Sequence, residues 1–313
     1  MHTAPPPPRD GVGPSCVRLP HSGPWATVLD YLTERFPAHR DSLHTQVAAG
    51  DVVDAHGQAV DHTTPFAGHG RVYVYRPLPV EVPVPFELTV LHRDEHLLVV
   101  DKPHFLATMP RGAHVVETAL TRLRRRFDLP ELSPAHRLDR LTAGVLVFTV
   151  HRDARRPYQT LFAEQAVEKE YEALAPFRDD LALPTTVRSR IVKTRGVLQA
   201  REVAGTPNAE THVDVLARFG DHARYRLRPR TGRTHQLRVH MNSLGLPLVG
   251  DPLYPEIREV APDDFCDPLR LLARRVRFTD PLTGLSREFV SNSALEPVQA
   301  PEPVHPNSFT RAG

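Results

Sequence analysis

The chain has 313 residues, of which 40% are hydrophobic and 24% charged, as is usual for a globular protein, and its formal net charge is +2. No apolar run approaches the roughly 18 residues of a membrane span, and two cysteines are too few for a disulfide framework. The start of the chain lacks a secretory signal pattern, so we expect a soluble cytoplasmic protein without a membrane partner.

The net charge is too small to mark a nucleic-acid binder by itself, so any RNA contact depends on local clusters of arginine. Arginines are concentrated within residues 122–126, 224–238 and 270–277. Charge runs are usually solvated faces, and each cluster alone is therefore a weak signal.

The first 77 residues fall into two parts. Residues 1–24 are rich in Pro and Gly and predict a disordered leader. Residues 25–77 predict two short helices followed by short strands, a pattern that resembles the outline of an S4-type RNA-binding domain in degenerate form. Four arginines face six acids there, and a net charge of minus two disfavours a phosphate-binding face. Either RNA binding or a packing role remains open for this domain.

Residues 78–85 alternate Pro with apolar residues and predict a stiff linker, after which we expect a second domain over residues 86–295. In that domain, residues 97–100 predict a buried strand that ends before Lys102, for which we expect a structural role. Residues 116–127 have helical spacing, and their arginines could form a basic face. The Pro-rich residues 296–313 predict a disordered tail.

A short charged segment, residues 136–144, directly precedes the apolar run 145–148, and this pattern predicts a loop that leads into a buried strand. Asp139 would then be held on a rigid support. For such a segment alone, an ordinary ion pair between Asp139 and Arg137 or Arg140 is the simpler interpretation. We expect His136 to anchor the loop. After the strand, Pro157 can begin a helix.

Downstream, residues 167–173 alternate as a strand does, with Lys169 and Tyr171 on one face. Residues 211–217 and 224–228 predict antiparallel strands, which argues against an all-parallel sheet. Residues 230–241 then predict a helix with Thr234 as its N-cap.

These three segments, around Asp139, Tyr171 and Arg238, resemble in identity and order the motifs of the RluA-type family of RNA pseudouridine synthases. The resemblance spans about residues 86 to 290, and residues 250–254 also resemble a family segment. It implies an α+β catalytic domain with a mixed, mainly antiparallel sheet and flanking helices. The chain departs from the common pattern only at the flanking positions Leu141 and Ala143.

The resemblance implies an isomerase that converts specific uridines of ribosomal or transfer RNA to pseudouridine. Asp139 would be the catalytic carboxylate, attacking C1′ or removing the C2′ proton, and Arg238 its partner. Tyr171 would stack on the base against Leu237. The remaining residues implied to bind the substrate are Arg137, which fills the space of the flipped base, Lys169 and Arg233.

We expect no metal and no other cofactor, because neither the His235–His240 spacing nor the His136–Asp139 spacing matches a metal-site motif. The expected partner is RNA, and we take the chain to be a monomer, on which no motif bears.

Two other functions stay open. The first is a catalytically silent RNA-binding protein on the same scaffold, against which the presence of Asp139, Tyr171 and Arg238 weighs. The second is a hydrolase of a glycosidic or phosphate bond. A glycosidase normally needs a second carboxylate, and none lies within the Asp139 segment.

Overall fold

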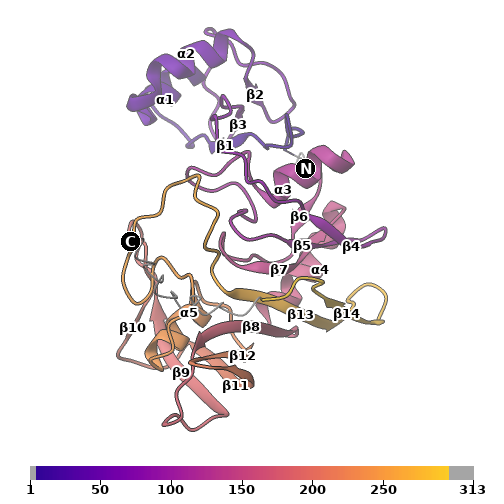
Figure 1. Cartoon of the computed structure of the whole chain (residues 1–313). Coiled ribbons are helices and arrows are strands. Elements are labelled where there is room, and N and C mark those ends of the chain that lie inside the picture. Colours follow the sequence, from indigo (N-terminus) through magenta and orange to yellow (C-terminus); the bar gives the residue numbers. More distant parts are fainter. Residues whose placement is uncertain (1–4, 296–313) are drawn as a thin grey trace, which may run out of the picture.

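The computed structural model describes residues 5–295, which form a small sheet with two helices and a large mixed sheet with three (Figure 1). The predicted tail, residues 296–313, lies outside the described residues. Between residues 5 and 295, no helix has the length and apolar character needed to cross a membrane. The helices are α1 (Val28–Arg35), α2 (Arg40–Ala48), α3 (Ala119–Phe127), α4 (Arg152–Ala163) and α5 (Gln236–Ser243), with a 3-10 turn, η1 (Pro37–His39). The strands are β1 (Ser15–Arg18), β2 (Val52–Asp54), β3 (Arg71–Val74), β4 (Thr89–Arg93), β5 (Leu97–Lys102), β6 (Ser133–Pro134), β7 (Ala143–Thr149), β8 (Glu168–Pro176), β9 (Thr185–Val192), β10 (Arg201–Val203), β11 (Ala209–Phe219), β12 (His222–Pro229), β13 (Leu271–Thr279) and β14 (Ser286–Val290).

The large sheet has eleven strands and the central order β10-β9-β11-β12-β8-β13-β7-β5-β4, while β14 pairs with β13 and β6 with β7. Only β13 and β7 run parallel to each other; the other pairs are antiparallel. The predicted mixed, mainly antiparallel sheet of an α+β domain is therefore confirmed. The hairpin of β11 and β12 turns at Gly220, with φ +59°, as its sequence predicts.

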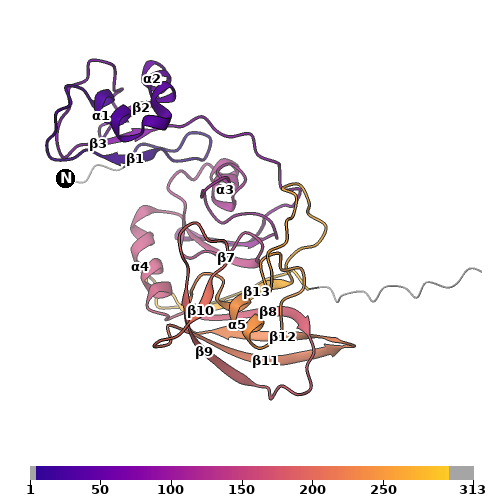
Figure 2. The ribbon, with the colours of Figure 1, turned by 90° about the vertical axis from the view of Figure 1, so that its left-hand side faces the viewer.

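Two hydrophobic clusters lie on opposite faces of β5 and β7, because alternate residues of these strands enter each cluster. Leu98 and Leu146 join the cluster that contains α3 and α5, whereas Leu97 and Val145 pack against Tyr158 of α4. Figure 2 shows α3 and α4 beside β7, and α5 against the β11–β12 half of the sheet.

The expectation of a disordered leader is wrong for part of residues 1–24. Strand β1 pairs with β3, which gives the small sheet the order β1-β3-β2. Val17 packs on the small domain's core, so this short apolar alternation gains a partner that a Pro-rich composition does not reveal. Arg9 pairs with Asp51 and its guanidinium lies 3.8 Å from the Tyr75 ring centroid.

Helix α3 does not present the free basic face that its sequence suggests. Arg122 pairs with Glu117, and its guanidinium also donates to the linker carbonyls of Val84 and Phe86. Arg124 donates to Leu132 and Gly11. These arginines satisfy backbone carbonyl groups and so tie the linker and the leader to the helix.

Helix α4 begins earlier than predicted. It starts at Arg152, with Pro157 inside it, and not at Pro157. Asp153 in the first turn is favoured by the helix dipole. The signal from a proline at the first helical position was therefore misleading here.

Gly144, at the start of β7, has φ +111° where β7 runs beside β13. A Cβ atom at this position would overlap the carbonyl oxygen of Ala273 and lie 2.7 Å from its nitrogen. The close approach of the two strands, directly after the Asp139 loop, thus requires glycine.

We predict that Gly144→Ala lowers the free energy of unfolding by at least about 2 kcal/mol, because it combines backbone strain with overpacking. Gly284→Ala is the control, since that glycine has φ +72° but no atom within 4 Å of the added Cβ. Urea unfolding of both variants measures the difference. Equal losses would show that the β7–β13 contact is not the cause.

Candidate active site

The loop that carries Asp139 is fastened to the segment after β5. Lys102 is buried and its ammonium donates to the carbonyls of Pro103, Leu106 and Arg140. Burial lowers the pKa of Lys102 to about 7, although the charge of Asp139 opposes this shift. These three acceptors match the donors of an ammonium group, as expected of a structural lysine.

Two further contacts hold the same loop. The hydroxyl of buried Thr108 donates to the Leu138 carbonyl at 2.8 Å and accepts the Leu138 N–H at 3.1 Å. The His104 ring lies 2.7 Å from the Leu141 carbonyl oxygen. The residues on both sides of Asp139 are thereby fixed by side chains from a segment about 30 residues earlier.

Arg238 lies in α5 and is held by a second acid. Its Nη2 and Nε lie 2.6 Å and 2.8 Å from the two carboxylate oxygens of Asp251, and Asp251 is fully buried. Its Nη1 lies 3.7 Å from Asp139 Oδ2. Burial lowers the pKa of Arg238, but the bonds to Asp251 and the two carboxylate charges outweigh burial and raise it. The guanidinium therefore stays charged and faces Asp139.

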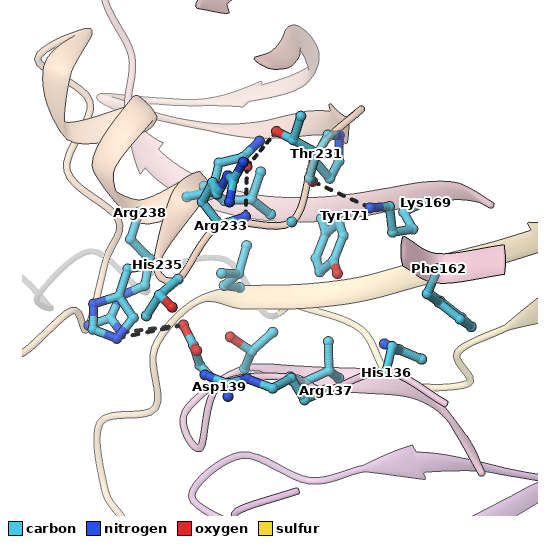
Figure 3. A pocket seen from close by; sticks show the side chains of 18 of the residues that line it. His136, Arg137, Asp139, Phe162, Lys169, Tyr171, Thr231, Arg233, His235 and Arg238 are labelled. Carbon is cyan, nitrogen blue, oxygen red and sulfur yellow. Dashed lines mark hydrogen bonds and ion pairs between the residues drawn. The ribbon is translucent and has the colours of Figure 1, made fainter. Parts of the chain in front are cut away.

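His235 is the other neighbour of Asp139, with Nε2 4.0 Å from its carboxylate (Figure 3). The Tyr254 hydroxyl donates to the Ala200 carbonyl at 2.9 Å, so its contact with His235 Nδ1 at 3.0 Å must be an N–H donated by the histidine. The pKa of His235 is lowered, mainly by burial. A neutral His235 thus presents an unprotonated Nε2 toward Asp139.

The two faces of β8 differ as its alternation predicts. Lys169 and Tyr171 face a pocket, and Lys169 also donates to the Thr231 carbonyl at 3.3 Å. Burial raises the pKa of Tyr171 above its ordinary value, with a smaller contribution from the charge of Asp139. On the opposite face Glu170 pairs with Arg275.

One pocket of about 710 Å³ brings the candidate residues together, as Figure 3 shows. All seven site residues predicted from the sequence line it: Arg137, Asp139, Lys169, Tyr171, Arg233, Leu237 and Arg238. Among its described lining residues Asp139 is the only acid, and it is surrounded by the basic residues Arg111, Arg137, Lys169, Lys193, Arg233 and Arg238. The pocket can therefore hold a polyanion around a single carboxylate.

Sequence reasoning missed three residues of this site. Asp251 was part of a recognised segment but had no role assigned, and its burial beside Arg238 depends on tertiary contacts. In the sequence His235 stands out only by its spacing from His240, and nothing marks Phe162 as a site residue. His235, and not Thr234, is the N-cap of α5, with φ +57° and no side-chain cap. The sequence signal for Asp251 is its place as an acid directly after Gly250. In the structure this glycine has φ +74°.

His136 anchors the loop, in line with its expected role. Its Nε2 accepts the Val147 N–H at 3.2 Å, and its ring stacks on Phe162 with a centroid distance of 4.3 Å. Burial lowers the pKa of His136 to about 3, with a smaller contribution from Lys169. Protonation of His136 at Nε2 would break its bond to Val147, and protonation therefore favours the unfolded chain.

We predict that His136 makes stability depend on pH. Because its pKa is lower in the folded state than its ordinary 6.5, its contribution is complete above pH 6.5 and decreases as the pH falls toward 3. His136→Gln should therefore be less stable than the wild type above pH 6.5, with a smaller difference near pH 5. Urea unfolding at both pH values measures this, with the exposed His151→Gln as control. A constant difference would contradict it.

We also predict that Asp251→Asn lowers the free energy of unfolding by about 3–5 kcal/mol, because it leaves the Arg238 charge buried without a full partner. Asp214→Asn is the matched control. It breaks a pair with Arg226 in which both side chains are about a quarter to a third exposed, so we expect less than about 1 kcal/mol. Similar losses in both variants would contradict a special role of the buried pair.

Among residues 5–295, no group of three or more His, Cys, Asp or Glu side chains is placed to hold a metal ion. The chemistry available to the pocket's own residues is that of one carboxylate beside a guanidinium, an imidazole and an aromatic ring.

Comparisons with known proteins identify the family. The family model described as RNA pseudouridylate synthase matches residues 96–243. The dual-specificity RNA pseudouridine synthase RluA of Haemophilus influenzae is 33% identical over 212 residues, which cover 66% of this chain and 93% of the relative. RluA of Escherichia coli O6:H1 is 36% identical over 211 residues, covering 64% and 91%.

Solved structures agree. The human RNA pseudouridylate synthase domain containing 1 superposes with a TM-score of 0.54 at 27% identity, over 68% of this chain and 86% of that one. The chain therefore belongs to the RluA-type family of RNA pseudouridine synthases, isomerases that convert uridine in RNA to pseudouridine.

Proposed function

We propose that Asp139 is the catalytic carboxylate of this isomerase and that its substrates are specific uridines of ribosomal or transfer RNA. The reaction breaks the bond between uracil N1 and ribose C1′, rotates the base, and joins C5 to C1′. The proton lost from C5 is matched by the one gained at N1, so the product is an isomer. Asp139 attacks C1′ or removes the C2′ proton, and both routes require an ionised carboxylate.

The observation that carries this proposal is the position of Asp139 as the only acid among the described residues of a strongly basic pocket. Its side chain is 26% exposed, so it is accessible, and the Arg238 guanidinium lies 3.7 Å from its carboxylate. Such a site attracts a nucleic acid and offers it one nucleophile or base.

The residues around Asp139 fit an extruded uridine. Taking a base out of RNA costs a few kcal/mol, and stacking on an aromatic ring returns about 1 to 3 kcal/mol. Tyr171 supplies that ring and Leu237 an apolar wall. Arg137, exposed at the pocket's edge next to Asp139, fills the space that the base leaves. Lys169 and Arg233 contact the nucleotide's polar groups.

A glycosidic hydrolase is disfavoured by the same geometry. Two carboxylates flank the bond in most such enzymes, whereas Asp139 has no second acid beside it in the pocket. Asp251, the buried acid behind Arg238, is occupied by Nε and Nη2 of that arginine and by the N–H groups of Leu253 and Tyr254.

We infer that the small N-terminal domain, with its S4-like outline, is a packing module. From Ser15 to Pro77 the sequence has five arginines and six acids, so the domain has no net positive charge to attract RNA. Its leader is joined instead to α3, through Gly11 and Asp10.

We predict that Asp139→Asn reduces pseudouridine formation by a factor on the order of 10⁴ without unfolding the protein, because it removes the charge but keeps the side-chain shape. The measurement is a map of pseudouridine in ribosomal and transfer RNA from cells that lack the gene and carry either variant or wild type. Asp263→Asn, an exposed acid, is the control.

A site that disappears on deletion and returns with wild type and Asp263→Asn, but not with Asp139→Asn, supports the proposal and names the substrate. Full restoration by Asp139→Asn would refute the catalytic role of Asp139. Release of free uracil in place of isomerisation would indicate hydrolysis.

A further inference from the structure

A second hollow, on the surface of α4, adjoins the active-site pocket. This α4 groove has a volume of about 400 Å³ and shares two lining residues, Gln159 and Ala163, with the pocket that contains Asp139. Phe162, on the same helix, points into the pocket (Figure 3). The groove is lined by Arg152, Arg155, Arg156, Gln159, Thr160 and Ala163. It is therefore continuous with the site at which a uridine reacts.

Four residues of the groove are aligned along one face of helix α4. Arg152, Arg156, Gln159 and Ala163 are separated by four, three and four positions, so they lie on one face of α4 and all four are exposed. Since a helix rises 1.5 Å per residue, the arginine at the start lies about 16 Å along the axis from Ala163 at the pocket.

Two arginines of the groove, Arg152 and Arg156, differ from the arginines that pair with acids elsewhere in the described chain. On the opposite side of the large sheet, Arg226 pairs with Asp214 and Arg275 with Glu170. By contrast, no acid is among the residues that line the α4 groove, and within residues 5–295 the guanidinium groups of Arg152 and Arg156 make no ion pair or hydrogen bond. The nearby Glu131 carboxylate accepts the backbone N–H of Arg152 at 3.3 Å.

The third arginine of the groove, Arg155, has only part of its guanidinium hydrogen-bonded. One end of its guanidinium donates to the Glu131 carbonyl at 2.6 Å, while its Nε is buried without a partner. Burial lowers the pKa of Arg155, the charge of Glu131 opposes this shift, and the charge of Arg152 adds a smaller lowering. Clustered like charges are unfavourable in the free protein, so an anion on this face would relieve their repulsion.

We propose that the α4 groove binds the sugar–phosphate backbone of the substrate RNA next to the extruded uridine. This inference rests on the proposed function, since it takes the pocket to be the uridine site. Arginine matches phosphate with paired hydrogen bonds, and phosphate contacts fix the register of a nucleic acid without reading its sequence. Continuity with the pocket favours RNA over an acidic protein as the occupant.

The groove is also connected mechanically to the catalytic loop. Phe162 stacks on His136, and His136 accepts the N–H of Val147 at the strand that follows Asp139. A backbone held on α4 is thus held relative to Asp139, through packed groups and not through a flexible segment. The groove would set which uridine along the strand reaches the pocket.

The test is the double variant Arg152→Ala/Arg156→Ala in the full chain. The probe is a short, fluorescently labelled RNA stem–loop with uridines in its loop, and Kd is measured over a range of salt concentrations. We expect Kd to rise on the order of tenfold and the slope of log K against log salt to become shallower by about 2, about 1 for each lost phosphate contact. In turnover measurements the double variant should raise KM by a larger factor than it lowers kcat.

The control Arg228→Ala/Arg277→Ala removes the same charge from two exposed strand arginines outside both hollows. An equal change in both double variants, or an unchanged slope in the α4 variant, would overturn the proposal. A loss confined to kcat would also overturn it. Binding is measured separately from turnover. If RNA binds through α4 while the pseudouridine map shows no site that depends on Asp139, the proposed function is refuted and the groove remains a binding site for an RNA backbone.

Discussion

The buried ion pair of Arg238 and Asp251 is the interaction on which the site depends. A guanidinium that is 3% exposed has few alternatives in orientation once two of its nitrogens are bonded to a buried carboxylate, so its third nitrogen faces Asp139. An ion pair of this kind contributes little net stability but is costly to break, which makes it a device for position more than for folding. The arrangement of Arg238 between Asp251 and Asp139 is held in place by strand β7, the Asp139 loop and α5.

Positive charge is concentrated at the pocket that contains Asp139. Over the whole chain it nearly cancels, at +2, yet the described pocket residues place six bases around one acid. Several arginines elsewhere are bonded to acids or to backbone carbonyls, among them Arg226, Arg275 and Arg124. The global net charge therefore says little about RNA binding here, because the field that a phosphate backbone meets is local.

The sequence could predict what depends on short-range patterns. Alternation in residues 167–173 and 211–228 indicated the strands and the face of Tyr171, and the three motif segments indicated the family and the pocket residues. It could not predict contacts between distant segments. The partner of Arg238, the pairing of β1 with β3 and the carbonyl contacts of α3 all depend on chain packing. The predicted start of α4 is wrong because Pro157 lies inside the helix, five residues after Arg152, a position at which proline is usually disfavoured since it removes a backbone hydrogen bond.

The most direct test of this account is a double-mutant cycle on kcat with Asp139→Asn, Asp251→Asn and the two combined, at a temperature where every variant is folded. If Asp251 acts by aiming Arg238 at Asp139, Asp251→Asn alone should lower kcat by one to two orders of magnitude, about 1.4 kcal/mol for each, and add nothing in the Asp139→Asn background. Full kcat in folded Asp251→Asn, or equal losses in both backgrounds, would contradict the account.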